Sequence, residues 1–199
     1  MTIPTLNRLR ELKLGGMAHA LQQQQEQPGP YAELSFTERL AMLVEQEHLY
    51  REQKKQSRLL QQAHLKLSAT LQDIDYQHPR NVERSQIAQL AQSEWINRGQ
   101  NLLITGPCGS GKTYLACAFG HNACLHGYSV QYYRLSRLLQ ALTQAKADGS
   151  YPKLLRQLAR IRLLVLDDWG LEPLTQAHRN DLLEIMDDRH GQSSTVVIS

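Results

Sequence analysis

Eight consecutive residues, Gly106 to Thr113, have the types and the spacing that bind phosphate groups. They read Gly-Pro-Cys-Gly-Ser-Gly-Lys-Thr and match the pattern Gly-x-x-x-x-Gly-Lys-Ser/Thr at every fixed position. Glycine is needed because backbone N–H groups must close on the phosphate oxygens without a side chain in the way. A helix that begins here adds its own free N–H groups and the positive end of its dipole. The predicted nucleotide-binding residues are Gly106, Pro107, Cys108, Gly109, Ser110, Gly111, Lys112 and Thr113.

Two side chains of this loop have roles of their own. Lys112 is expected to reach the β- and γ-phosphates and to take part in catalysis. The hydroxyl of Thr113 is expected to bind Mg²⁺. The predicted cofactors are therefore ATP and Mg²⁺, whereas a plain glycine-rich turn between a strand and a helix would need neither.

A pair of acids, Asp167 and Asp168, follows the apolar run Leu163–Leu166. Such a run predicts a strand that is buried on both faces. Ligands bind at the carboxyl ends of strands in an open parallel sheet, so we expect these acids beside the phosphate loop. Asp167 would hold Mg²⁺ through its water shell, and Asp168 would orient or deprotonate an attacking water. The two acids alone would more simply begin a solvated turn, but the loop upstream favours a site.

Short apolar runs alternate with helical stretches from Asn101 onward. This alternation predicts an α/β fold of the P-loop NTPase class, with a parallel sheet flanked by helices. A helix is expected over Tyr114–His126. The expected strands are Leu102–Ile104, Val130–Tyr133, Leu163–Leu166 and Val196–Ile198.

The earlier part of the chain is expected to be helical. Leucines recur every three to four positions in residues 1–27 and 35–67, and Ser35 or Thr37 is a candidate cap for the second stretch. Prolines break the chain at 28–30 and at 78–80. We therefore expect a helical DNA- or partner-binding region at residues 1–78 and an ATPase core at residues 79–199.

Composition narrows the class of protein. The formal net charge of +3 is too small to argue for nucleic-acid binding by itself. Three cysteines with no paired spacing predict free thiols, and Cys117 and Cys124 are expected to share one buried helix face. The longest apolar run, Tyr114–Phe119, is far shorter than a membrane-spanning helix, and no secretory signal is evident. A cytoplasmic protein without a membrane partner is expected.

Several long stretches resemble one family. Besides the phosphate loop, Leu163–Leu174 and Asp181–Gly191 look like the ATPase module of IstB-type insertion-sequence helper proteins, which are related to DnaC-type helicase loaders. Leu12–Ala20, Leu34–Glu47 and the approach Asp73–Arg84 also look like this family, so the resemblance covers nearly the whole chain.

The resemblance implies an AAA+ ATPase of insertion-sequence transposition. Such a protein binds duplex DNA without sequence preference, forms an ATP-dependent homo-oligomer, and recruits and stimulates a transposase. The family's strand order is 5-1-4-3-2, with a helical lid after the fifth strand. Here the fourth strand is expected at Thr195–Ser199, where the chain stops. We therefore expect a truncated gene product with strand one on an exposed edge, nucleotide binding retained and turnover in doubt.

Two other functions remain open at this stage. A DnaC-like replicative helicase loader would use Leu6, Leu9 and Leu12 to hold a partner protein. A truncated module that binds nucleotide without hydrolysing it is the other alternative.

Surface residues supply the remaining candidates. The second helical stretch carries a run of basic residues, Arg51, Lys54, Lys55, Arg58 and Lys66, offset only by Glu52. This basic face is a candidate for DNA contact, although such faces are usually only solvated. Arg189 is a candidate for reaching the nucleotide of a neighbouring subunit. The acids of the same predicted helix are expected to form a solvated face, and they are Asp181, Glu184, Asp187 and Asp188. Ile74–Tyr76 are expected to help enclose the adenine ring, and Glu172 is a substitute base that more simply faces solvent. The DNA-contact candidates are Arg51, Lys54, Lys55 and Arg58.

Overall fold

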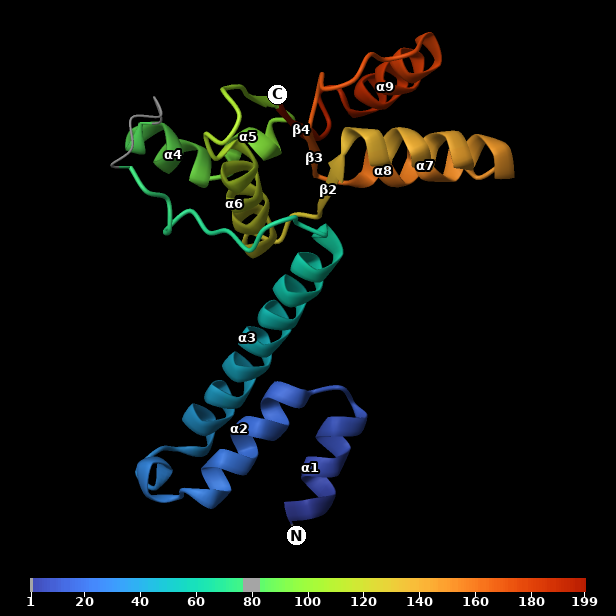
Figure 1. Ribbon diagram of the computed structural model, residues 1–199. Coiled ribbons are helices and arrows are strands. Elements are labelled where there is room, and N and C mark those ends of the chain that lie inside the picture. Colours follow the sequence, from blue (N-terminus) through green and yellow to red (C-terminus); the bar gives the residue numbers. More distant parts are fainter. Residues whose placement is uncertain (1, 77–82) are drawn as a thin grey trace. The chain divides into compact units, whose positions relative to one another are not determined.

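A computed structural model describes residues 2–76 and 83–199 of the protein (Figure 1). The chain forms two compact units, which divide between Ser57 and Arg58. The sequence placed the boundary at residue 78, near the proline break that lies among the residues not described. The division comes earlier because Leu59, Ala63 and Ala69 are buried in the core of the second unit.

The first unit is helical, as the leucine spacing predicted. Its third helix starts at a capping box, in which the backbone N–H of Glu38 donates to Ser35 Oγ at 3.3 Å and that of Ser35 donates to Glu38 Oε2 at 2.8 Å. This cap confirms Ser35 rather than Thr37 as the start of one long helix. The helices are α1 (Thr2–Glu11), α2 (Gly15–Glu26), the 3₁₀ turn η1 (Gly29–Tyr31) and α3 (Phe36–Ala63), whose last residues belong to the second unit.

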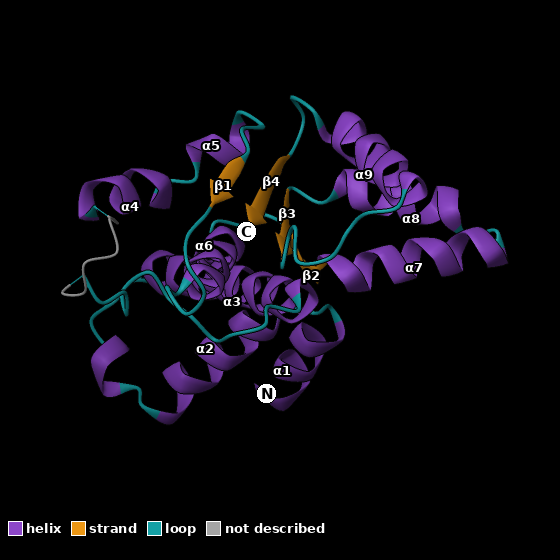
Figure 2. Ribbon diagram, turned by 45° about the horizontal axis from the view of Figure 1, so that its top comes forward, coloured by secondary structure: helices purple, strands orange, loops and turns teal. Residues whose placement is uncertain are grey.

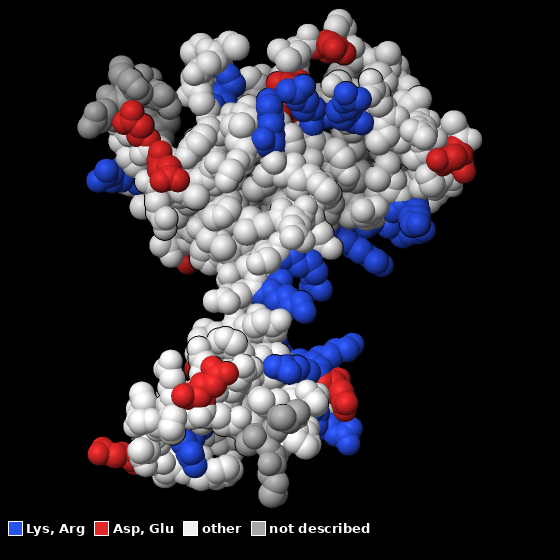
Figure 3. Space-filling model, turned by 60° about the horizontal axis from the view of Figure 1, so that its bottom comes forward, with Lys and Arg blue, Asp and Glu red and all other residues white. Residues whose placement is uncertain are grey.

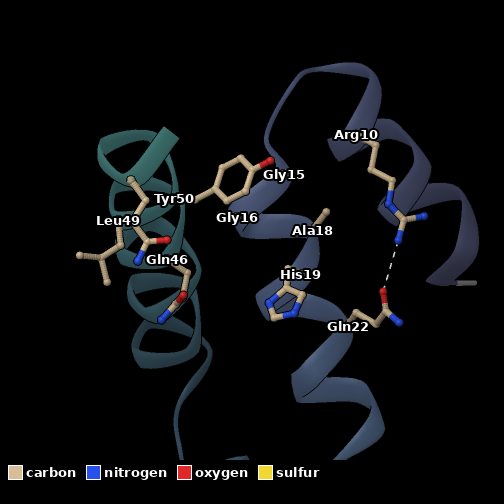
Figure 4. A pocket seen from close by; sticks show the side chains of 10 residues that line it. Arg10, Gly15, Gly16, Ala18, His19, Gln22, Gln46, Leu49 and Tyr50 are labelled. Atoms are coloured by element: carbon tan, nitrogen blue, oxygen red, sulfur yellow. Dashed lines mark hydrogen bonds between the residues drawn. The ribbon is translucent and has the colours of Figure 1, made fainter. Parts of the chain in front are cut away.

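Close packing of α2 on α3 depends on Gly16. A Cβ atom built on Gly16 would lie 2.5 Å from the carbonyl oxygen of Gln46, so only glycine fits. The buried carboxylate of Glu47 accepts hydrogen bonds from the backbone N–H groups of Gly16 at 2.8 Å and Met17 at 3.2 Å. Figure 4 shows Tyr50 pointing from α3 toward the start of α2, at the edge of a cavity of about 660 Å³.

The second unit is built on a parallel sheet. Its strand order, β1-β4-β3-β2, is the 1-4-3-2 part of the AAA+ order, so the expected fold is confirmed. β1 is an edge strand, and Leu103 is 65% exposed. The elements in chain order are α4 (Arg84–Ala91), α5 (Glu94–Asn97), β1 (Leu102–Ile104), α6 (Lys112–Leu125), β2 (Val130–Arg134), α7 (Leu135–Asp148), α8 (Tyr151–Arg160), β3 (Leu163–Asp167), α9 (Gln176–Arg189) and β4 (Ser194–Ile198).

Alternate residues of β3 point to opposite sides of this sheet. Leu163 and Val165 pack with α6, and Leu164 and Leu166 pack with α7, α8 and α9 (Figure 2). A strand covered on both faces is uniformly apolar, which is why an unbroken apolar run predicted it correctly. Cys117 and Cys124 are free and fully buried in α6, as expected. Among the residues that the structure describes, no helix is long and apolar enough to cross a membrane.

Candidate nucleotide site

The phosphate loop joins the end of β1 to the start of α6. Gly109 and Gly111 have φ angles of +79° and +88°, which residues with a side chain rarely adopt. The loop therefore has the backbone conformation that its glycines predicted. The ammonium of Lys112 donates to the carbonyl oxygens of Gly106 at 2.5 Å and Pro107 at 2.9 Å. In this conformation Lys112 lies folded back over the loop.

Asp167 lies directly opposite the loop, at the carboxyl end of β3. It is 2% exposed, and its Oδ2 accepts a hydrogen bond of 2.9 Å from Thr113 Oγ1. Two further groups approach the same oxygen: the hydroxyl of Tyr132 donates to it at 2.6 Å, and the ammonium of Lys66 lies 3.9 Å away. The structure thus brings together the two residues that the sequence assigned to Mg²⁺.

Burial and the negative charge of Asp167 act together on Tyr132. Burial raises the pKa of Tyr132, and its hydrogen bond to Asp167 raises the pKa further. The hydroxyl therefore stays protonated and remains a donor to the carboxylate. Tyr132 lies in the strand that the sequence predicted at Val130–Tyr133 and packs in the core, but its hydroxyl also belongs to the site.

Asp168 follows with its backbone in the left-handed region, at φ +63°. This conformation is uncommon for a residue with a side chain and indicates local constraint. The N–H of Asp168 donates to Asp167 Oδ1 at 2.8 Å, and its own carboxylate lies 3.4 Å from Nε of Arg134, at the end of β2. The two acids therefore point in different directions and have different partners. Glu172 is exposed in the following turn.

A cavity of about 740 Å³ lies beside the loop. Ile74, Asp75 and Tyr76 line it together with loop residues such as Gly111 and Lys112. Leu90, Leu115 and Phe119 add apolar lining, which is suitable for a planar base. Ile74–Tyr76 therefore lie at this cavity, and their contact with an adenine ring stays a prediction.

The donor set opposite the loop fits Mg²⁺. Thr113 supplies a hydroxyl oxygen and Asp167 a carboxylate oxygen, and Mg²⁺ prefers hard oxygen ligands shared with phosphates and water. Their hydrogen bond of 2.9 Å holds the two oxygens side by side, at the start of α6 and the end of β3.

Comparison with known proteins identifies the family. The profile described as IstB-like ATP binding protein matches residues 7–199. The chain belongs to the IstB-like family. A protein of Pseudomonas fluorescens, named for ATP binding in insertion sequence IS1162, is 48% identical to this IstB-like chain over 200 residues, which cover all of the chain and 86% of the relative.

Two solved structures support the AAA+ fold of this IstB-like protein. The DnaC helicase loader has a TM-score of 0.52 and 25% identity, with 62% of this chain and 74% of the loader covered. DnaA from Aquifex aeolicus, bound to AMPPCP, has a TM-score of 0.58 and 22% identity, with 68% of this chain and 43% of DnaA covered. At that lower identity the likeness to DnaA shows the fold alone.

The role expected for Arg189 is wrong. This residue of the IstB-like chain is 1% exposed, so it cannot reach a neighbouring subunit. Its guanidinium donates to the carbonyl oxygens of Leu158 at 2.6 Å and Ile161 at 2.7 Å, to Thr195 Oγ1 at 3.1 Å and to the carbonyl oxygen of Ser194. Burial, with a smaller effect from Arg162, lowers the pKa of Arg189 to about 10, so the group is still charged at neutral pH.

The environment of Asp181, which lies on the same helix α9 as Arg189, also differs from expectation. The sequence predicted a solvated acid, but Asp181 is buried and accepts hydrogen bonds from Lys146 and, at 3.0 Å, from the hydroxyl of Tyr151. Tyr151 also donates to Glu184 at 2.7 Å. Helical spacing placed these acids on one face, but the partners on α7 and α8 are distant in sequence.

The basic face of α3 remains a candidate surface. The side chains of Arg51, Lys54, Lys55 and Arg58 are all exposed. Arg51 is paired with Glu47 at 2.6 Å, and the ammonium of Lys54 lies 5.9 Å from the ring centre of Tyr50. Lys and Arg side chains gather along the surface that α3 contributes (Figure 3).

Sequence reasoning missed three side chains at the nucleotide site. Lys66, Arg134 and the hydroxyl of Tyr132 all approach the acid pair. The sequence could have indicated Arg134 and Tyr132, because residues at the carboxyl end of the strand next to β3 are expected to lie near the acid pair. The sequence grouped Lys66 with the basic residues of the long helix, but α3 ends at Ala63 and Lys66 lies in the irregular segment that follows.

Proposed function

We propose that the protein binds ATP with Mg²⁺ and hydrolyses it to ADP and phosphate, as a helper of insertion-sequence transposition. The observation that carries this proposal is the 2.9 Å hydrogen bond between Thr113 and Asp167. It joins the two elements that hold a nucleotide-bound cation in P-loop proteins.

Each residue of the site has a part in the proposed reaction. The loop N–H groups and Lys112 hold the phosphate tail, once Lys112 exchanges the carbonyl oxygens of Gly106 and Pro107 for phosphate oxygens. Thr113 and Asp167 would hold Mg²⁺, which when bound neutralises charge that develops on the phosphates. Asp168 orients the attacking water or takes its proton, and Arg134 fixes the carboxylate for this role.

A titration of ATP into the protein by calorimetry tests the nucleotide site. The unsubstituted chain is expected to bind, and Lys112→Ala is expected to lose about tenfold or more in affinity, because a charge-assisted contact to phosphate is removed. Hydrolysis is tested separately by phosphate release, which Asp168→Asn should abolish while binding remains. Equal affinity in Lys112→Ala and the unsubstituted chain would contradict the proposal.

DNA and a transposase are the proposed partners. The exposed basic face of α3 supports contact with the phosphate backbone of duplex DNA, which needs no sequence-specific readout. The 48% identity to a protein of insertion sequence IS1162 supports a transposase as the protein partner. ATP-dependent assembly into an oligomer is proposed on the resemblance to AAA+ proteins.

A replicative helicase loader is the second candidate. The likeness to the DnaC helicase loader, at a TM-score of 0.52, favours it. Pull-down with purified partners separates the two functions. A purified insertion-sequence transposase should be retained in the presence of ATP, whereas selective retention of a replicative helicase would favour the loader.

A further inference from the structure

Asp167 carries a charge that needs compensation before any metal arrives. Its carboxylate is 2% exposed, and a buried carboxylate without a partner is strongly destabilising. Thr113 and Tyr132 donate hydrogen bonds to Oδ2 but bring no net charge. The ammonium of Lys66, 3.9 Å from the same oxygen, is a cation that faces it.

Lys66 is held near Asp167 by the packing of its neighbours. Leu65 packs against α6 at Gly120, where an added Cβ would lie 2.8 Å from Leu65 Cδ2, and Ala69 is buried in the same core. The Lys66 side chain itself is 35% exposed. The backbone around Lys66 is therefore fixed, while its side chain has an open route to solvent.

We propose that Lys66 is the resident counter-ion of Asp167 in the nucleotide-free protein, and that it gives up this position when Mg²⁺ and nucleotide bind. Tyr132 is a positioning residue that holds the same carboxylate in place in both states. This inference rests on the proposed function, since it concerns the same cation site.

Lys66 and Tyr132 are expected to have opposite effects on the binding of Mg²⁺, because one acts through its charge and the other through a hydrogen bond. A divalent cation held by Thr113 and Asp167 would be repelled by the ammonium of Lys66, which lies 3.9 Å from the same carboxylate oxygen, so Lys66 opposes binding of the cation. Tyr132 brings no positive charge, and its hydroxyl donates to Asp167 Oδ2 at 2.6 Å, so it fixes the carboxylate without repelling a cation. A residue that hydrogen-bonds to a metal-binding carboxylate strengthens metal binding.

The test measures nucleotide binding rather than turnover. A fluorescent ADP analogue is titrated into the full chain, first in EDTA and then at increasing Mg²⁺, and the Mg²⁺ concentration for half-maximal enhancement is recorded. Lys66→Met is expected to lower this Mg²⁺ concentration about threefold to fivefold, because a change of that size corresponds to the free energy of a partly exposed ion pair. Tyr132→Phe is expected to raise the Mg²⁺ concentration about tenfold. This is the lower end of the loss in metal affinity seen when a residue that hydrogen-bonds to a metal ligand is substituted.

Two matched variants control for effects on folding. Lys153→Met removes an exposed lysine of α8, and Tyr133→Phe removes the neighbouring hydroxyl on β2, where the side chain packs in the other core cluster. Neither should change the Mg²⁺ dependence. A thermal melt of every variant identifies any loss of fold.

The outcomes separate this inference from the proposed function. If the unsubstituted chain binds no nucleotide, with or without Mg²⁺, the proposed function fails. If it binds but Lys66→Met leaves the Mg²⁺ dependence unchanged, or weakens binding equally in EDTA and Mg²⁺, Lys66 is not a counter-ion that yields to the metal. An unchanged Mg²⁺ dependence in Tyr132→Phe would overturn the role of Tyr132.

Discussion

Thr113 and Asp167 are 54 positions apart in the chain and joined by a hydrogen bond from Oγ1 to Oδ2 of 2.9 Å. The bond links the first turn of α6 to the end of β3. If both residues act through the proposed cation site, the effects of substituting them should depend on each other.

Substitutions of Thr113 and Asp167 should reduce the contribution of Mg²⁺ to nucleotide binding and leave the binding of phosphate by the loop unchanged. Thr113→Ala and Asp167→Asn are each expected to abolish most of the Mg²⁺ enhancement of nucleotide binding, while binding in EDTA remains. The double variant should lose little more than either single one, because neighbouring groups of one site are not additive. Calorimetry of all three variants measures this, with Thr143→Ala on α7 as a control.

Arg189 is expected to stabilise the fold of the second unit. Arg189→Leu removes the side-chain donor that the carbonyl oxygens of Leu158, Ile161 and Ser194 share, which should lower the free energy of unfolding by about 3 kcal/mol. Arg189→Lys should lose part of this, since an ammonium cannot reproduce the planar fork. Urea unfolding followed by tryptophan fluorescence reports on the second unit, which holds Trp95 and Trp169.

An unchanged stability of Arg189→Leu would reopen the role of Arg189 at a neighbouring subunit's nucleotide. If Arg189→Leu unfolded at the same urea concentration as the unsubstituted chain but lost ATP hydrolysis, an action on a bound nucleotide would have to be reconsidered.

Gly16 should tolerate no side chain. In Gly16→Ala the new methyl group would meet the backbone of Gln46 and Glu47, so α2 must shift and the first unit should lose about 1–3 kcal/mol. Gly29→Ala is the matched control, because a Cβ there meets no atom within 4 Å. Urea unfolding followed by far-UV circular dichroism compares the two. Equal destabilisation by both variants would argue against the close approach of α2 and α3.

The contacts of Glu47 should make the start of α2 sensitive to acid. Burial alone would raise the pKa of Glu47, but hydrogen bonds from Arg51, Met17 and Gly16 outweigh it and lower the pKa below 4.5. The stabilisation is therefore complete above pH 4.5 and is lost as the pH falls through the lowered value.

Hydrogen exchange measures this loss directly. The amides of Gly16 and Met17 donate to Glu47, so their protection, corrected for intrinsic rates, should fall as the pH drops below 4.5. In Glu47→Gln that change should be absent, because glutamine does not titrate. A pH-independent protection in the unsubstituted chain would contradict the assignment.

The basic face should contribute salt-dependent DNA binding. Removing Lys54 and Lys55 together is expected to weaken binding to duplexes of any sequence and to reduce the slope of log K against log salt by about 2. Fluorescence anisotropy at several salt concentrations measures this. Lys153→Ala with Arg156→Ala, two exposed charges on α8, is the control. Equal losses in both double variants would mean that α3 has no special role.

Sequence alone determined the elements that depend on local signals. The phosphate loop and the apolar run before Asp167 each lie within a few residues, where backbone conformation and short-range hydrogen bonds decide the outcome. The sequence also limited the cap of α3 to Ser35 or Thr37, and the hydrogen bonds between Ser35 and Glu38 decided between them. Alternation of strands and helices then fixed the fold class, and the parallel sheet placed the acids beside the loop.

Only the tertiary structure decided the roles of charged residues far from those signals. Arg189 and Asp181 follow a pattern typical of a solvated helix face, yet both are buried, because carbonyl groups of α8 and the side chains of Lys146 and Tyr151 provide partners. Lys66 is placed beside Asp167 by the packing of Leu65 and Ala69. The free energy of a buried charge depends on groups brought together by folding, and helical periodicity carries no information about them.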